Sequence, residues 1–143
     1  MILTDVDISL DKIIIRLLKM RLKKPFETSF GKTIEREIIL VTLKSDEILG
    51  WGECTADTGP WYSYETTQTA LHIMKDFIIP ILKKNRIISN PKKFCDILSI
   101  IRGNNMAKAA FEIAFWDLYA KMLGKPLYLV IGGNKEKIVS GVS

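Results

Sequence analysis

Apolar and β-branched residues gather in three runs of strand length in the first part of the chain. Residues 12–22 are rich in isoleucine, residues 37–43 form a β-branched run, and residues 48–54 make up the third. Asp46 and Glu47 lie between the last two runs, where a turn is expected. The pattern predicts a three-stranded antiparallel meander.

From Ser63 onward the apolar residues recur every three or four positions, which is the period of a helix. Asn90 is predicted to cap a second helix that has Pro91 at its first position and ends at Gly103. The first helix is expected to bury the apolar stripe Ala70, Met74, Phe77, Ile78 and Ile81.

A third helix is predicted to be capped by Asn105 and to stop at Gly124 and Pro126. Its expected core stripe is Met106, Ala109, Ile113, Trp116, Ala120 and Leu123. Because the strands precede the helices, the pattern indicates an α+β domain, in which the meander is followed by a helical bundle.

Three further segments have no helical period. Residues 25–31 and 55–62 carry proline, glycine and hydroxyl side chains, so both are expected to be loops. Residues 137–143 have the pattern of a new strand. A strand at this place needs a partner from elsewhere, which suggests that the sequence is part of a longer protein.

Composition and charge narrow the classes of protein. A chain of 143 residues that is 48% hydrophobic can build a core. The formal net charge is +5, but the basic residues are scattered and aromatic residues do not interleave with them, so we expect no nucleic-acid partner. No apolar run approaches a membrane span and the N-terminus lacks the order of a secretory signal, so a cytoplasmic protein without a membrane partner is expected.

The residues that could carry chemistry have simpler explanations. Cys54 and Cys95 lie far apart with only His72 as a nitrogen ligand, which argues against a zinc site and for reduced, buried thiols. His72 is expected on the surface, and Glu112 is expected to be a paired structural carboxylate. Taken alone, these residues reveal no active site.

The segment Gly50-Trp51-Gly52 begins like a dinucleotide-binding loop. Thr55 occupies the sixth position of that motif, and a bulky tryptophan stands where a phosphate must approach the backbone. Glycine packed in the core beside a strand end is therefore the preferred interpretation.

Three motifs in order resemble the N-terminal part of the enolase superfamily. They are residues 24–31 (KPFETSFG), residues 50–54 (GWGEC) with 59–62 (GPWY), and residues 105–118 (NMAKAAFEIAFWDL). The closest pattern is the muconate-lactonising subgroup, in its o-succinylbenzoate synthase and N-acylamino acid racemase branch. The resemblance covers the chain from about residue 12 onward.

This resemblance implies an enolase-type N-terminal capping domain over residues 1–134, with residues 135–143 as the first strand of an absent (β/α) barrel. In such enzymes the barrel holds Mg²⁺ with three carboxylates and supplies lysines that act as acid and base, so that the enediolate is stabilised. The resemblance therefore implies that this chain holds no catalytic and no metal-binding residue, and that it is inactive alone.

The resemblance also implies which residues touch the substrate. Capping loops in the family exclude water from the reaction and select the substrate's tail. By position, the substrate-binding residues would be Phe26, Thr28, Ser29, Asp57, Tyr62 and Ser143. Simple packing is the alternative explanation for Phe26 and Tyr62.

The function implied for the parent enzyme is dehydration of a small carboxylate to o-succinylbenzoate in menaquinone synthesis. N-acylamino acid racemisation and dipeptide epimerisation stay open, because the Asp57 carboxylate would repel an anionic tail. A stand-alone, non-catalytic binding module is the alternative from another class. An exposed apolar docking seam would also favour association, so a homo-oligomer is expected.

Overall fold

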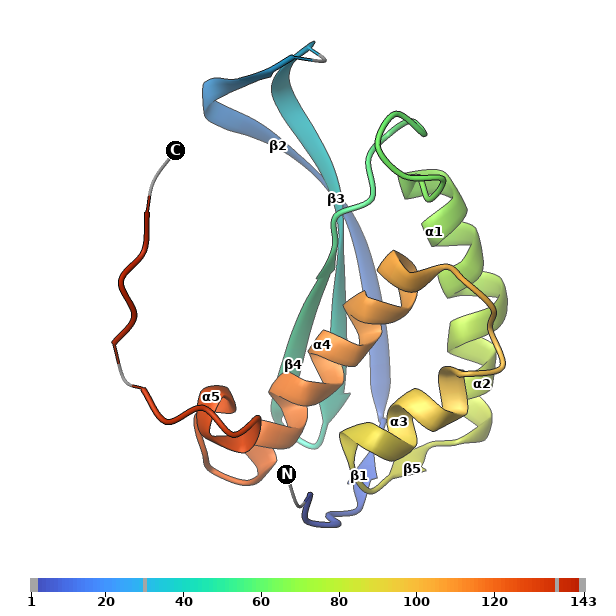
Figure 1. Ribbon diagram of the computed structural model, residues 1–143. Coiled ribbons are helices and arrows are strands. Elements are labelled where there is room, and N and C mark those ends of the chain that lie inside the picture. Colours follow the sequence, from blue (N-terminus) through green and yellow to red (C-terminus); the bar gives the residue numbers. More distant parts are fainter. Residues whose placement is uncertain (1–2, 30, 136, 142–143) are drawn as a thin grey trace.

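A three-stranded antiparallel sheet forms one layer of the molecule and the helices form the other (Figure 1). The computed structural model describes residues 3–29, 31–135 and 137–141. The sheet has the order β2 (Lys12–Thr28), β3 (Gly31–Ser45) and β4 (Ile48–Cys54). This confirms the predicted meander and the α+β class.

The turn between β3 and β4 forms at Asp46 and Glu47, as predicted. Asp46 adopts a left-handed φ of 49°, which aspartate tolerates in tight turns. Its backbone N–H donates to Asp11 Oδ2 over 2.7 Å. This bond and one from the Ser9 hydroxyl hold the pKa of Asp11 below its ordinary value, since both stabilise the carboxylate.

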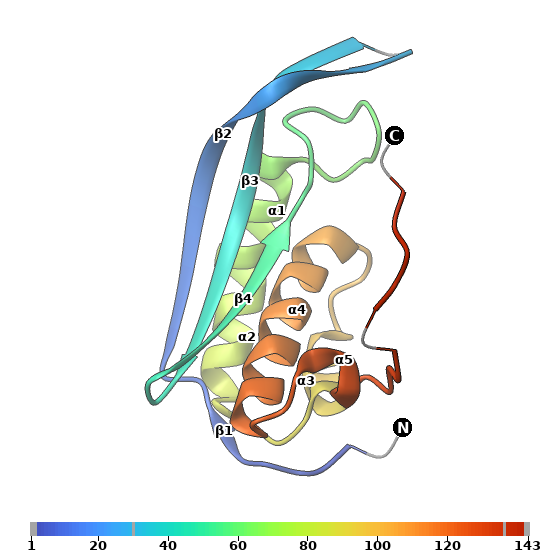
Figure 2. The same ribbon diagram turned by 90° about the vertical axis from the view of Figure 1, so that its left-hand side faces the viewer.

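Most of the described residues of the predicted loop 25–31 belong to strands, since residues 25–28 extend β2 and Gly31 begins β3, and Ser29 lies in the turn. Strands β2 and β3 stay paired from Phe26 opposite Thr33 to Thr28 opposite Gly31, and they form an arm that projects beyond the helices (Figures 1 and 2). The register breaks between Arg21 and Phe26, and Pro25 lies inside this break. Proline has no N–H to donate, which is why strands accept it at such irregularities.

The first predicted helix is built from three consecutive pieces. They are α1 (Thr67–Ile73), a π-helical turn η1 (Met74–Ile78) and α2 (Ile79–Lys84). Ala70, Met74 and Ile78 are buried as predicted, whereas Phe77 is 47% exposed. The chain then forms β5 (Ile87–Ile88), which pairs with β1 (Ile8–Ser9).

The second helix, α3 (Pro91–Leu98), begins as predicted and ends before Gly103. The Asn90 side chain accepts a hydrogen bond from Lys93 N over 2.9 Å, which confirms the cap. The third helix, α4 (Asn105–Met122), is preceded by Asn104 as its N-cap. The predicted cap, Asn105, is the first helical residue instead.

Helix α4 ends at Met122, with Leu123 as its C-cap, just before the predicted stop at Gly124. Gly124 has a φ of 62°, its N–H donates to Lys121 O, and the N–H of Lys125 donates to Ala120 O. These bonds satisfy the last carbonyl groups of the helix, as in a Schellman motif. The short helix α5 (Leu127–Val130) follows.

The predicted core stripe of α4 is only partly right. Ile113 is 48% exposed, whereas Ala120 is buried and Met106, Trp116 and Leu123 are partly buried against the core. The fully buried residues of α4 are Ala107, Ala110, Phe111, Ala114, Phe115, Leu118 and Tyr119, and of these Ala110, Ala114 and Leu118 lie against the glycines of β4. Both faces of this helix are apolar, so the period alone could not distinguish them. The contact with β4 decides which face is buried.

Glycines in β4 make this contact. A Cβ at Gly52 would lie 1.9 Å from Ala110 O, and one at Gly50 would lie 2.1 Å from Ala114 O. The backbone of α4 therefore rests directly on the backbone of β4. The structural interpretation of these glycines is confirmed.

The expected strand at 137–143 is not seen in residues 137–141, which pair with no other strand among the described residues. Ile138 and Val139 are fully or almost fully exposed there. Within the described ranges no helix is long and apolar enough to cross a bilayer.

Candidate functional site

The arm formed by β2 and β3 carries three of the residues expected to touch the substrate. Phe26 lies opposite Thr33 and is 60% exposed, so it takes no part in the core. The Thr28 hydroxyl donates to Gly31 O over 3.4 Å at the end of the arm. Ser29 lies in the following turn and is exposed.

Asp57 and Tyr62 lie on the second segment, residues 55–66, which connects β4 to α1. Tyr62 is 91% exposed, which excludes packing in the core as its role. The Asp57 carboxylate accepts hydrogen bonds from the backbone N–H and the hydroxyl of Thr58, at 2.7 Å and 3.4 Å. One carboxylate oxygen is thus held by the segment itself.

Hydrogen bonds fix the start of the 55–66 segment to the helical layer. Thr67 is buried; its N–H donates to Asp57 O over 2.8 Å, and its hydroxyl donates to Ala56 O over 3.1 Å. Asp57 and Thr66 also form an isolated bridge. The two ends of the segment are therefore held beside each other.

Glu65 fixes the other end of this segment, and sequence reasoning missed it. Glu65 is 4% exposed, and its carboxylate accepts hydrogen bonds from Met106 N at 3.0 Å and from Ala107 N at 3.2 Å. These are free donors of the first turn of α4, where a negative charge is favoured. Glu65 lies far from α4 in the sequence, so no local pattern signals this cap.

Three large aromatic side chains of the 55–66 segment point away from the core. Trp61, Tyr62 and Tyr64 are 85%, 91% and 69% exposed. A segment whose ends are fixed while its aromatic side chains stay in water presents a surface that can bind another group. Sequence reasoning named Tyr62 alone of the three.

The arm and the 55–66 segment lie at the same end of the molecule in both views (Figures 1 and 2). The fold thus brings Phe26, Thr28 and Ser29 to the end that also carries Asp57 and Tyr62. Ser143, the remaining expected contact, lies outside the described residues.

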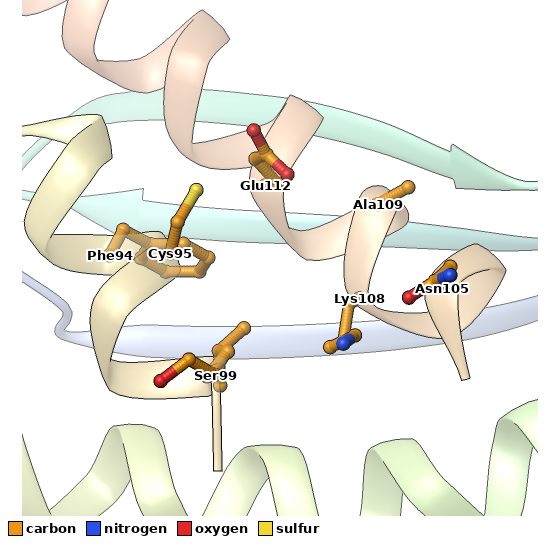
Figure 3. Close-up of a pocket in the computed structure, with 8 residues that line it drawn as sticks. Phe94, Cys95, Ser99, Asn105, Lys108, Ala109 and Glu112 are labelled. Atoms are coloured by element: carbon orange, nitrogen blue, oxygen red, sulfur yellow. The ribbon is translucent and has the colours of Figure 1, made fainter. Parts of the chain in front are cut away.

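A pocket of about 400 Å³ lies elsewhere, between α3 and α4 (Figure 3). None of the expected substrate-binding residues lines it; Cys95, Ser99, Lys108 and Glu112 do. Burial and a hydrogen bond to the Glu112 carboxylate raise the pKa of the Cys95 thiol to about 11. Glu112 is thus paired with a thiol, and Cys95 is half-buried instead of fully buried.

His72 lies on the surface, as expected, where its Nδ1 is 2.7 Å from Asp76 Oδ2. Within the described residues, no group of three or more His, Cys, Asp and Glu side chains could hold a metal ion. The resemblance places the magnesium site in the barrel, which this chain does not span, so the described residues are given no role in holding the metal.

Comparison with protein families gives one match over most of the chain. Residues 12–132 match the model of the mandelate racemase / muconate lactonizing enzyme N-terminal domain. The matched range includes the arm, the 55–66 segment and α4.

Individual relatives agree with this match. An o-succinylbenzoate synthase from Geobacillus stearothermophilus is 47% identical over 137 residues, which are 95% of this chain and 36% of that protein. An N-succinylamino acid racemase from Thermus thermophilus is 40% identical over 129 residues, which are 90% of this chain and 35% of that protein.

A solved enolase-superfamily structure from Listeria innocua superposes with a TM-score of 0.83 and 36% identity, over 90% of this chain and 35% of that one. The sequence thus spans little more than a third of the length of these relatives.

Proposed function

Since the chain belongs to the mandelate racemase / muconate lactonizing enzyme N-terminal domain family, we propose that it forms the substrate-covering part of an o-succinylbenzoate synthase-like enzyme. The reaction centre, including a magnesium ion, would be held by the part of such an enzyme that this chain does not span. The identity of 47% to an o-succinylbenzoate synthase supports this assignment.

The observation that carries the proposal is the placement of Phe26 and Tyr62. Both rings are more than half exposed, at one end of the molecule, on segments whose bases are hydrogen-bonded to the core. Exposed aromatic rings on segments that are fixed to the core at their base are suited to a lid. When the lid closes, the rings are buried against the substrate and water is excluded.

Asp57 bears on the choice of substrate. Its carboxylate would repel an anionic succinyl tail if it faced that tail directly. Thr58 N donates to Asp57 Oδ1 over 2.7 Å, and this bond turns one oxygen toward the segment's own backbone. The charge of the carboxylate remains, so an anionic succinyl tail is expected to lie away from Asp57 or beside a cation.

A second candidate, N-succinylamino acid racemisation, rests on the 40% identity to the Thermus thermophilus racemase. Both candidate reactions would use the same lid, because both substrates carry a succinyl group. The lid residues of this chain do not by themselves separate the two reactions.

A chimera tests the proposal. Residues 1–132 of this chain replace the matching segment of the Geobacillus stearothermophilus o-succinylbenzoate synthase, and kcat/KM is measured for the o-succinylbenzoate precursor, N-succinylamino acids and a dipeptide. We expect activity on the precursor, and a loss of about tenfold or more in kcat/KM for Phe26→Ala and for Tyr62→Ala. A preference for N-succinylamino acids would favour the second candidate.

Ile87→Ala is the matched control, because Ile87 is an exposed apolar residue, 67% accessible, on β5 at the opposite end of the molecule (Figure 1). The control should leave kcat/KM unchanged. A folded chimera that turns over none of these substrates, or one in which Phe26→Ala and Tyr62→Ala behave like Ile87→Ala, would contradict the proposal. The first outcome would favour a stand-alone binding module.

A further inference from the structure

The pocket between α3 and α4 combines apolar side chains with charges of both signs (Figure 3). Its volume of about 400 Å³ lies in the range that is usual for small-molecule sites. Phe94, Leu98 and Ala109 form its apolar part, whereas Lys108 and Glu112 bring a cation and a carboxylate. Every residue that lines the pocket lies on α3, on the C-cap of α3 or on α4, so no other described segment closes it.

The two charges of the pocket stand four positions apart on α4, at the spacing where ion pairs form on a helix. Lys108 and Glu112 nevertheless form no ion pair with each other or with any other residue in the described ranges. Lys92 and Asp96, at the same spacing on α3, lie 3.0 Å apart. The open pair is therefore a feature of the pocket and does not follow from the spacing.

Contacts across the pocket hold the two charges apart. Lys108 Nζ donates to Ile101 O over 2.9 Å, in the segment that follows α3. The Glu112 carboxylate accepts a hydrogen bond from the Cys95 thiol on α3. A carbonyl and a thiol are neutral, so each charge is left without a counter-charge. Both side chains are half-buried, and water therefore screens them less than it screens charges on an open surface.

We propose that this pocket binds a small apolar amino acid as a zwitterion, with the carboxylate of the ligand on Lys108 and its ammonium group on Glu112. The side chain of the ligand packs against Ala109 and over the almost fully buried Leu98. Each charge of the pocket then has a counter-charge, and charge-assisted hydrogen bonds are roughly twice as strong as neutral ones. The proposal does not depend on the proposed function.

Ligands of other charge fit the pocket less well. A simple anion on Lys108 would be repelled by Glu112, one helical turn away, and a monoamine on Glu112 would leave Lys108 without a counter-charge. A metal cation is disfavoured because Glu112 is the one carboxylate that lines the pocket. Within the described residues no group of three or more metal-binding side chains occurs.

Calorimetric titration of the purified protein tests the proposal, with L-leucine as the probe. We expect leucine to bind with a dissociation constant in the millimolar range. Isoamylamine and 4-methylpentanoate have a similar apolar part but only one charge each, so both should bind about tenfold more weakly or worse.

Variants of the two charged residues locate the binding. Lys108→Met and Glu112→Gln should each raise the dissociation constant of leucine about tenfold or more, because each removes one counter-charge. Lys83→Met is the matched control, since Lys83 is exposed on α2 and does not line the pocket. The control should bind leucine like the wild type.

Alkylation of Cys95 provides a second measurement, because this thiol lines the pocket. Leucine should slow the reaction of Cys95 with iodoacetamide, measured by mass spectrometry, and the concentration for half protection should match the calorimetric dissociation constant. Lys108→Met should lose this protection, whereas Lys83→Met should keep it.

Three results would each overturn the proposal. They are the absence of leucine binding at every soluble concentration, equal affinities for leucine and its two singly charged analogues, and a folded Lys108→Met protein that binds leucine as tightly as the wild type. The last result decides the matter even if Glu112→Gln fails to fold.

Discussion

Glu65 shows how one buried side chain can join two distant parts of the chain. It ends the 55–66 segment and caps the first turn of α4, so the position of the segment is tied to the central helix. The N-cap residue Asn104 makes no side-chain capping bond. The carboxylate of Glu65 accepts the hydrogen bonds of the first turn of α4 that a local N-cap side chain would otherwise accept.

We predict that Glu65→Ala lowers the free energy of unfolding by about 2 kcal/mol, because it leaves buried donors of α4 without acceptors. Glu65→Gln should lose less, since an amide oxygen still accepts a hydrogen bond. Urea denaturation measures both values. Glu47→Ala, at a carboxylate that is 95% exposed, is the control and should be neutral. Equal stability of Glu65→Ala and wild type would refute the capping role.

The Cys95 thiol should react slowly with iodoacetamide. A pKa of about 11 instead of 9.0 leaves about 100-fold less thiolate near pH 8, and the thiolate is the reactive form. Glu112→Gln should accelerate alkylation of Cys95, measured by mass spectrometry of the labelled peptide. Asp76→Asn removes an exposed carboxylate elsewhere and should not change the rate. An unchanged rate in Glu112→Gln would show that Glu112 does not hold the thiol protonated.

Because of Asp11, the free energy of unfolding should decrease at acidic pH. Its folded-state pKa is lowered by the bonds from Asp46 N and Ser9, so its stabilising contribution is present above its ordinary value of 3.8 and is lost as the pH falls through the folded pKa. Asp11→Asn should therefore flatten the dependence of the urea midpoint on pH below about 4. Parallel pH profiles for the variant and the wild type would exclude this role.

At the scale of elements, the contact between β4 and α4 determines the fold of the two layers. We predict that Gly52→Ala destabilises the protein by about 3 kcal/mol, because the new Cβ would overlap the backbone of Ala110. Denaturant titration measures the loss. Gly141→Ala is the control, since no atom lies within 4 Å of its added Cβ. A Gly52→Ala protein as stable as this control would refute the close contact.

The sequence predicted the elements better than their faces. Three strands, the Asn90 cap and the Gly124 stop follow from local patterns, because turns and caps are local chemistry. The buried face of α4 could not be predicted, since Ile113 and Phe111 are both apolar and only the fit to Gly52 distinguishes their faces. Gly52 in a strand indicated that another backbone comes close to β4, but the sequence did not show that this backbone belongs to α4.

The candidate site was predicted only in part, because some of its contacts join residues that are far apart in the sequence. Phe26 and Tyr62 were found through a family resemblance, and their exposure agrees with a role outside the core. Residues 25–31 were expected to be a loop because of their proline, glycine and hydroxyl side chains, although a break in register accommodates Pro25 within β2. Glu65 was missed because its partners lie on α4.

At the scale of the whole molecule, the arm is separable from the core. Residues 23–28 and 31–36, which form the two strands of the arm, are all exposed. We predict that replacing residues 22–34 by an Asn-Gly turn, which joins Arg21 to Glu35, changes the free energy of unfolding by less than about 1 kcal/mol. In the chimera the same replacement should reduce kcat/KM sharply.

Denaturant titration and steady-state kinetics check these two expectations separately. Loss of folding would show that the arm supports the core. Unchanged kinetics with normal folding would show that the arm does not cover the substrate.

The break in the β2 register has a mechanical consequence. Residues 22–25 lie opposite Ile34 alone, so the ladder of hydrogen bonds is interrupted between Arg21 and Phe26. On the other side of this break the sheet packs on α4, where the backbone of β4 at Gly52 lies directly against the backbone of Ala110. Since the ladder lacks bonds here, this break is where the paired strands resist bending least, and a change in the direction of the outer hairpin is expected to occur at it.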